Sequence, residues 1–451
     1  MKKLFCLICL GLLAAVSCSR PAPTASDLND SGLKKSDAHD YAGAIADFTQ
    51  AVALDPKNAD AYANRGDAKD VQGDHDGALA DYNQALALDP KDVRTYNNRG
   101  ITKRVMGDLA GAIADYSQAL TLDPKHIEAY YNRGLAKRAQ GDYDGAIADY
   151  TSALALDPKK SDAYNNRGVA KKAKGDLEGA IVDFSQALVL DPKDADALNN
   201  RGIAKKSLGD VDGAIADYNQ ALALDPKHAD ATFNRALARR AKGDLDGAIA
   251  DYTRALELDP KDAKAYNNRG YAKQLKTDLA GAIADYSSAI ELSPKDSAAY
   301  DNRAFCRQAT GDFPNAVADY DQVIALQPTS STYPRLYRQL TQRRLGQTPP
   351  DFAATVAVWK DGWAKSLGLY LAGAQNEATL LAAAAAEADA TTALEQQCAA
   401  DYFIGVLRLS GGDQAAARDF FGKCVATGLK DTDEYQLSVA ELARLDAAAK
   451  K

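Results

Sequence analysis

Asparagine recurs every 34 residues along most of the chain, and its side chain is suited to holding an extended peptide. Eight residues share this phase: Asn64, Asn98, Asn132, Asn166, Asn200, Asn234, Asn268 and Asn302. An amide carries both a donor and an acceptor, so a spaced row of them can bind a backbone whatever its side chains are. We expect this row to bind peptide. The alternative, that each asparagine satisfies backbone groups of its own repeat, remains open.

A second row lies six residues after the asparagines, and its charge changes along the chain. It starts with Asp70 and ends with Gln274 and Gln308. The members between them are basic: Arg104, Arg138, Lys172, Lys206 and Arg240. Cations at these positions can select acidic segments. The two rows together therefore predict one groove for extended, somewhat acidic parts of other proteins.

The sequence offers no matching set of catalytic residues. Its four histidines lie in separate periods, and no two have the spacing of a metal site or a catalytic pair: His39, His75, His126 and His228. It has no phosphate-binding glycine loop and no nucleophile elbow. We expect no enzymatic activity, no metal site and no cofactor.

Composition narrows the class of partner. The 451 residues include 54 basic and 62 acidic side chains, a net charge of −8. A broadly acidic surface disfavours nucleic acid and anionic lipid head groups as primary partners. Other proteins are the expected partners.

The elements that position the two rows follow from the same period. Nine prolines recur in phase: Pro56, Pro90, Pro124, Pro158, Pro192, Pro226, Pro260, Pro294 and Pro328. Within one period, residues 59–72 have a helical apolar pattern that stops at Gly73, and a second helix after Asp74 stops before Pro90. The unit is a helical hairpin, and such units stack into an array in which each buries its apolar face against its neighbours.

The hairpin resembles the tetratricopeptide (TPR) repeat through Tyr62, Gly66, Ala78, Tyr82 and Pro90, a set that returns in later periods. The resemblance implies an all-α fold: an α-solenoid of about nine TPR hairpins, residues 25–330, in a right-handed superhelix, with the first helices lining its concave face. The family's carboxylate clamp is not expected, because apolar residues occupy its second asparagine position: Ile101, Leu135, Val169 and Ile203.

The chain departs from the TPR pattern on the first helix, where Arg65 and Lys69 replace apolar residues, and this pair recurs in each period. Every second helix carries an aspartate just before its aromatic residue, as at Asp81. We expect these residues to form structural ion pairs within and between hairpins. The other interpretation is a basic stripe offered to an anionic partner.

Beyond residue 330 the period is lost. Residues 331–397 are expected to be a helical linker region, and residues 398–451 a divergent TPR hairpin with a capping helix. This last part is similar to the C-terminal region of bacterial TPR lipoproteins of the NlpI type, through Cys398, Tyr402 and Gly405. By the register of the hairpin Cys398 lies opposite Cys424, so the two could form a disulfide or remain buried thiols.

The N-terminus predicts the location. Residues 1–17 read as a signal peptide, with Lys2 and Lys3 before an apolar run. They end before Cys18 in a sequence that resembles a lipobox, which implies lipidation of Cys18 and a lipidated tether over residues 18–26. Ser19 follows, and by resemblance to enterobacterial sorting it favours the outer membrane, with the chain facing the periplasm; a surface-exposed orientation stays open. An ordinary signal peptide is the alternative.

Two functions stay open. The first is a membrane-anchored periplasmic scaffold or adaptor for cell-envelope proteins. The second is a chaperone-like assembly factor that transiently holds unfolded or extended clients. The sequence determines neither the identity of the partners nor the oligomeric state.

Overall fold

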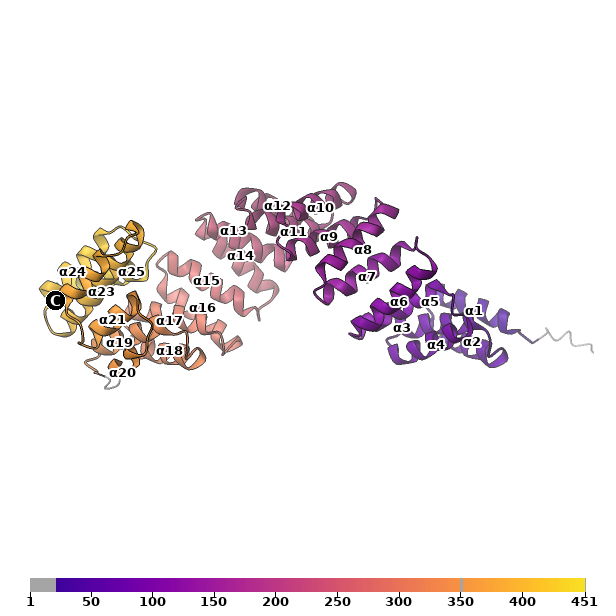
Figure 1. Ribbon diagram of the computed structural model, residues 1–451, viewed down its shortest axis with the longest axis horizontal. Helices are drawn as coiled ribbons and strands as arrows, with labels where there is room; N and C mark the ends of the chain where they lie inside the picture. The colour runs from indigo at the N-terminus through magenta and orange to yellow at the C-terminus, as the bar shows by residue number, and fades with distance from the viewer. Residues whose placement is uncertain (1–21, 349–351, 451) are drawn as a thin grey trace, which may run out of the picture. The chain divides into compact units, whose positions relative to one another are not determined.

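The computed structural model describes residues 22–348 and 352–450, and this part of the chain contains 25 α-helices and no β-strand (Figure 1). The chain divides into two compact units, unit 1 ending at Pro192 and unit 2 beginning at Lys193. Unit 1 contains α1 (Ala25–Asp37), α2 (Tyr41–Leu54), α3 (Ala59–Val71), α4 (His75–Leu88), α5 (Val93–Val105), α6 (Leu109–Leu122), α7 (Ile127–Ala139), α8 (Tyr143–Leu156), α9 (Ser161–Ala173) and α10 (Leu177–Leu190).

Unit 2 contains the other fifteen helices. Eight continue the repeats: α11 (Ala195–Ser207), α12 (Val211–Leu224), α13 (Ala229–Ala241), α14 (Leu245–Leu258), α15 (Ala263–Leu275), α16 (Leu279–Leu292), α17 (Ser297–Thr310) and α18 (Phe313–Leu326). Seven follow them: α19 (Thr332–Arg344), α20 (Phe352–Ala357), α21 (Trp363–Leu371), α22 (Glu377–Ala385), α23 (Ala390–Ser410), α24 (Gln414–Ala426) and α25 (Asp433–Ala449).

Helices α1 to α18 pack as nine consecutive hairpins, which confirms the predicted all-α repeat fold. Each turn within a hairpin is set by local chemistry. Gly73 has φ of +86°, a conformation that suits glycine, and Asp74 then accepts the N–H of Gly77 at 3.0 Å and begins α4. His39 and Thr277 take the place of this glycine in two repeats, and both have positive φ.

The two helices of a hairpin touch at the signature glycine. A Cβ added to Gly66 would lie 2.7 Å from Cε1 of Tyr82, so the ring packs directly on the backbone of α3. The tyrosine is buried, as is Ala78 one turn before it. Alanine replaces this glycine at Ala236 and Ala304, where the same contact accommodates a methyl group.

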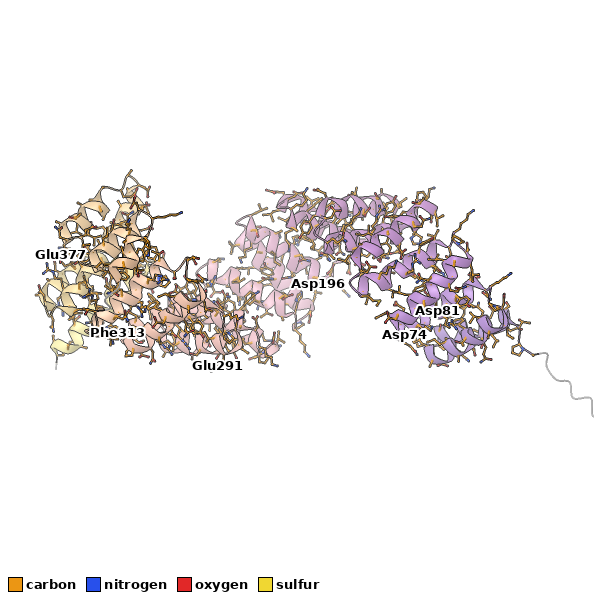
Figure 2. The ribbon with its side chains drawn as sticks, turned by 60° about the horizontal axis from the view of Figure 1, so that its bottom comes forward. Asp74, Asp81, Asp196, Glu291, Phe313 and Glu377 are labelled. Atoms are coloured by element: carbon orange, nitrogen blue, oxygen red, sulfur yellow. A yellow bond between two sulfur atoms is a disulfide. The ribbon has the colours of Figure 1, made fainter. Side chains whose placement is uncertain are left out.

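Between the two helices lies the predicted ion-pair ladder. Arg65 donates to both carboxylate oxygens of Asp81, at 2.9 and 2.7 Å, and Lys69 lies 2.8 Å from the same carboxylate. Asp81 is labelled in Figure 2. Arg65 also donates to Thr49 of the preceding hairpin at 3.3 Å and stacks over the ring of Tyr62. The structure thus confirms structural pairing, within and between hairpins.

The last seven helices share a core with the end of the repeats. Tyr320 of α18, Tyr337 of α19, Phe403 of α23 and Leu437 of α25 belong to one buried cluster. Gly405 and Phe421 repeat the glycine–ring contact between α23 and α24. A domain boundary at 397/398 falls inside α23, because this helix runs unbroken from residue 390 to residue 410.

Candidate functional site

The asparagine row lies on the first helices of the hairpins, and many of its amide nitrogens bond to the preceding hairpin. Nδ2 of Asn132 donates to Oδ1 of Asn97 at 3.0 Å, and both residues are buried. The same link, 35 residues back, joins Asn64 to Asn29, Asn166 to Tyr131, Asn234 to Asn199 and Asn302 to Asn267. These asparagine amide nitrogens therefore link successive hairpins of the repeat array.

The other asparagines of the row do not share this hydrogen bond to the residue 35 positions earlier in every case. Asn98 donates to Asp67 at 2.9 Å, Asn268 donates to the carbonyl of Lys264 at 2.8 Å, and Asn200 lies on α11. Within the described residues, four of the amide oxygens receive no hydrogen bond, those of Asn132, Asn166, Asn234 and Asn302. The asparagine row can therefore bind a peptide chiefly through its amide oxygens, which can accept hydrogen bonds from backbone N–H groups of the peptide.

The basic row differs sharply from the ion-paired residues beside it. None of its five members forms an ion pair with a carboxylate in the part of the chain that the structure describes: Arg104, Arg138 and Lys172 in unit 1, Lys206 and Arg240 in unit 2. All five side chains are half-buried. Burial lowers the pKa of Lys172, and burial together with the charge of Arg240 lowers that of Lys206.

Buried tyrosine hydroxyls without acceptors accompany four of these five cations, because Phe184 takes the tyrosine position in the repeat of Lys172. The hydroxyls of Tyr116 and Tyr150 and the Nε atoms of Arg104 and Arg138 are buried and have no hydrogen-bond partner. Burial raises the pKa of Tyr116 to about 12, and Arg104 beside it opposes that rise. Tyr218 and Tyr252 of unit 2 have the same unsatisfied hydroxyl.

The repeats that carry glutamine instead of a cation satisfy this hydroxyl. Tyr286 donates to Oε1 of Gln274 at 2.8 Å, and Tyr320 donates to Oε1 of Gln308 at 3.0 Å. Arginine and lysine have no acceptor, so they leave the tyrosine donor unused. An acidic group in the groove would accept from both the cation and the tyrosine.

A concave feature that sequence reasoning missed lies in unit 2, between the last repeats and the C-terminal helices. It is a cavity of about 570 Å³ lined by aromatic and acidic side chains, among them Tyr271, Asp301 and Asp433. One residue in the sequence could have indicated this cavity. Asp301 stands where the other repeats carry an uncharged residue.

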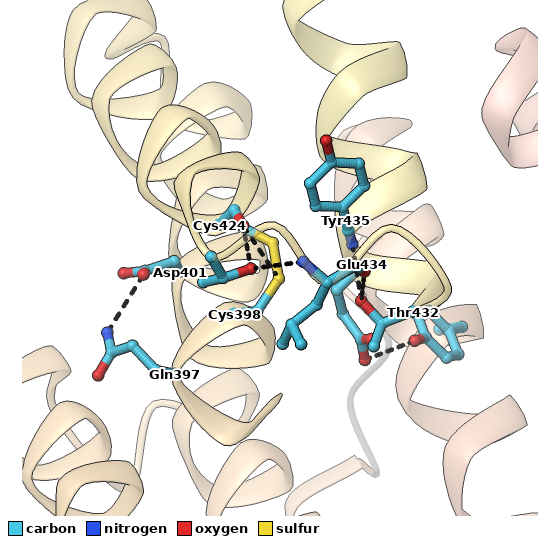
Figure 3. The surroundings of a disulfide bond; sticks show 10 residues. Gln397, Cys398, Asp401, Cys424, Thr432, Glu434 and Tyr435 are labelled. Atoms are coloured by element: carbon cyan, nitrogen blue, oxygen red, sulfur yellow. Dashed lines mark hydrogen bonds between the residues drawn. A yellow bond between two sulfur atoms is a disulfide. The ribbon is translucent and has the colours of Figure 1, made fainter. Parts of the chain in front are cut away.

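The cysteines of the C-terminal region lie in its core. Cys398 of α23 and Cys424 of α24 are joined by a disulfide, with their Cα atoms 4.2 Å apart (Figure 3). Cys306 is a buried thiol, and burial raises its pKa to about 12.

The histidines have local structural roles. His126 and His228 cap α7 and α13 by accepting a backbone N–H, His75 pairs with Asp70 at 2.8 Å, and His39 contacts Tyr41. The described residues contain no group of three or more His, Cys, Asp or Glu that could hold a metal ion.

The predicted lipidation site, Cys18, lies outside the described residues. Among the helices that are described, none combines the length and apolar character required to span a membrane.

Comparison with protein families identifies the repeats. A family model described as "Tetratricopeptide repeat" matches residues 30–93, 199–263 and 239–297, and one described as "TPR repeat" matches residues 104–137, 134–175 and 170–209. Together these matches cover more than half of the 451 residues. No curated protein matches the chain.

Several solved structures are similar to parts of the chain. A crystal structure of MamA protein is 30% identical and covers 38% of this chain and 94% of its own, with a TM-score of 0.35. A tetratricopeptide repeat protein from Parabacteroides merdae is 22% identical, with coverages of 55% and 98% and a TM-score of 0.43. PilW, described as a widely conserved type IV pilus biogenesis factor, is 25% identical, with coverages of 45% and 94% and a TM-score of 0.42.

Proposed function

Because the chain belongs to the tetratricopeptide repeat family, whose members are generally non-catalytic scaffolds, we propose that it is a membrane-anchored periplasmic scaffold or adaptor. Its basic row and asparagine row bind extended, acidic segments of cell-envelope proteins. The ligand lies along the first helices of successive hairpins, so that one segment meets several repeats.

The observation that carries this proposal is the pairing of an unneutralised cation with an unsatisfied tyrosine hydroxyl. A half-buried guanidinium beside a buried donor without an acceptor is costly unless a partner supplies the missing acceptor. A carboxylate does so for both groups, whereas a neutral or basic segment does not. The asparagine oxygens that receive no hydrogen bond add acceptors for the N–H groups of the same segment.

Anchoring is the second part of the proposal, and the sequence alone supports it. We propose that signal cleavage before Cys18 leaves a lipidated cysteine, and that the following tether joins it to α1. In fully extended form, the residues between Cys18 and α1 span under about 25 Å. The first repeat would then lie close to the outer membrane.

A crosslinking experiment in intact cells tests the scaffold. We would place a photoreactive amino acid at position 172 of the full chain, in the basic row, and at position 178 as a matched control, because Glu178 is exposed on α10. We expect position 172 to capture a small, reproducible set of envelope proteins and position 178 to capture none of them.

The set of captured proteins distinguishes the adaptor from the chaperone-like assembly factor. A defined set that co-purifies in fixed ratio with the chain supports the adaptor. A broad set, enriched when envelope proteins are unfolded by heat, would replace it with the chaperone-like assembly factor. Equal capture at both positions would contradict binding in the groove.

A further inference from the structure

The cavity in unit 2 has an aromatic wall. Rings from the last two repeats and the C-terminal helices line it: Tyr271 of α15, Phe305 of α17, Tyr333 and Tyr337 of α19, and Trp363 of α21. Aromatic faces attract cations through their quadrupole. One of these rings already holds one, because the guanidinium of Arg240 lies 5.0 Å from the centre of Tyr271.

Five carboxylates surround the same cavity. They come from α17, α23 and the turn into α25: Asp301, Glu395, Asp431, Asp433 and Glu434. No lysine, arginine or histidine lines the cavity, and none of the five carboxylates forms an ion pair in the part of the chain that the structure describes. Within the described residues, one side-chain hydrogen bond reaches these carboxylates: the hydroxyl of Tyr337 donates to Glu434 at 2.7 Å.

Three of these carboxylates, those of Asp301, Asp433 and Glu434, have raised pKa values. Burial raises the pKa of Asp301 to about 6. Restricted hydration by the surrounding protein, followed by the charges of Glu434 and Asp301, raises the pKa of Asp433 to about 7, although its side chain is exposed to solvent. Carboxylates that repel one another in this way are stabilised by a cation.

Gln274 provides an independent indication of a ligand. Its side chain is 6% exposed and lines the cavity. Its Oε1 accepts from Tyr286 at 2.8 Å and from the thiol of Cys306 at 3.4 Å, whereas its Nε2 has no partner among the described residues. Because Gln274 lines the cavity, this unused amide donor is available to a ligand there and is suited to the carbonyl group of a peptide.

The repeat pattern changes at this place in a concerted way. The basic row ends at Arg240, and Gln274 takes its next position. The position of Asp301 is uncharged in the other repeats: Ala63, Asn97, Tyr131, Asn165, Asn199, Phe233 and Asn267. The aliphatic position of Ile101 and Leu135 becomes Tyr271 and Phe305. In the last two repeats, next to the C-terminal helices, this face of the hairpins therefore carries no cation of the basic row. It carries instead one additional carboxylate and two aromatic rings.

We propose that this cavity binds a lysine or arginine side chain carried by an extended segment of a partner protein. The carboxylates neutralise the cation, the rings cover its aliphatic stem, and Gln274 donates to a main-chain carbonyl of the segment. A peptide is the occupant, not a free amine, because only a peptide uses the amide donor as well as the acids. This site is separate from the basic row and has the opposite charge preference.

A binding titration with matched variants tests this site. The full chain would be titrated with a fluorescein-labelled peptide of alternating lysine and alanine. We expect D301N/D433N to weaken binding by at least about tenfold. The control, D230N/E291Q, removes the same charge from two exposed residues of unit 2 that do not line the cavity, and should bind as the parent does.

Two further measurements show whether a loss of binding comes from misfolding of the variant or from a change in the basic row. Neutralising mutually repelling carboxylates should leave the melting temperature unchanged or raised, and a labelled polyglutamate peptide should bind the parent and D301N/D433N equally. Absent binding of the basic peptide at low salt, or equal binding to D301N/D433N and the parent, would overturn the proposal. Free spermidine competing as well as the peptide would also overturn it, in favour of a small-cation site.

Discussion

Arg133 donates to both oxygens of Asp149, at 2.9 Å from Nε and 2.6 Å from Nη2, whereas Arg138 on the same helix has no carboxylate partner in the described residues. Arg133, which stabilises the repeat, and Arg138, which is available to a ligand, therefore lie about one and a half helix turns apart on the same helix. This contrast recurs along the array and underlies the assignment of the basic row.

The first prediction concerns the stability of the ladder. Asp149→Ala leaves Arg133 and Lys137 without the carboxylate they share, and removing one partner of a largely buried pair costs about 3 to 5 kcal/mol. Urea unfolding followed by circular dichroism measures the loss. Asp144→Ala is the control, because its ion pair with Lys174 is exposed, and its midpoint should match that of the parent. Equal midpoints for the two variants would contradict a structural ladder.

The second prediction concerns the disulfide. Cys398 and Cys424 are 26 residues apart, and closing a loop of this size stabilises a fold by about 3 kcal/mol. Reduction should therefore lower the melting temperature of unit 2, and Cys398→Ser/Cys424→Ser should remove the effect of the reductant. In unreduced, unfolded protein, only Cys306 of the three described cysteines should react with iodoacetamide. Reaction at all three would show that the bond is absent.

The sequence predicted the repeats well because the period places each residue in a known register. The hairpins, the glycine–ring contact and the Arg65–Asp81 pair all follow from residues whose partners lie a fixed distance away in the chain. The same register brought Cys398 opposite Cys424. It did not show that the amide of Asn132 bonds to Asn97, because this contact depends on how closely the first helices of two successive hairpins approach each other.

The acidic cavity could not be predicted in this way. Its helical residues come from α15, α17, α18, α19, α21, α23 and α25, and the 34-residue period does not fix how α19, α21 and α25 pack on the repeats. Asp301, read alone, is one acidic residue among many. Its meaning depends on Asp433, more than 130 residues later, which only tertiary packing brings near.

The third prediction is a pH dependence of unit 2. The raised pKa values of Asp301 and Asp433 mean that the folded chain holds protons that the unfolded chain releases. Their stabilising contribution is full below the ordinary carboxyl pKa of about 4 and is lost as the pH rises through about 6 and 7. The other charged groups that line the cavity, Glu395, Asp431 and Glu434, are acidic, and the charge of Glu434 adds to the rise at Asp433.

Thermal melts of the parent and of D301N/D433N at pH 5 and pH 8 measure this contribution. The difference between the two proteins should favour the variant at pH 8 and shrink at pH 5. Other carboxylates of the chain titrate in both proteins and cancel in the comparison. A difference that does not change with pH would refute the perturbed titration.

The fourth prediction concerns anchoring. Cys18→Ala removes the thiol that lipidation requires, so an unprocessed precursor without lipid label should accumulate. Radiolabelled palmitate and detergent partition measure this, with Cys9→Ala, inside the proposed leader, as the control that is processed normally. Full processing and membrane partition of the Cys18 variant would rule out the lipobox.

The central claim, that the unpaired cations form the binding groove, is tested most directly by charge reversal in unit 1. Arg104→Glu/Arg138→Glu/Lys172→Glu would be compared with Lys57→Glu/Lys91→Glu/Lys125→Glu, which makes the same change in charge at exposed turns. The measurement is the affinity of the full chain for a labelled polyglutamate peptide at increasing salt. We predict that the first variant loses binding while its helix content is kept, and that the control and the parent bind with the same salt dependence. Equal loss of affinity in both variants would contradict the account, because binding would then follow net charge and not the groove.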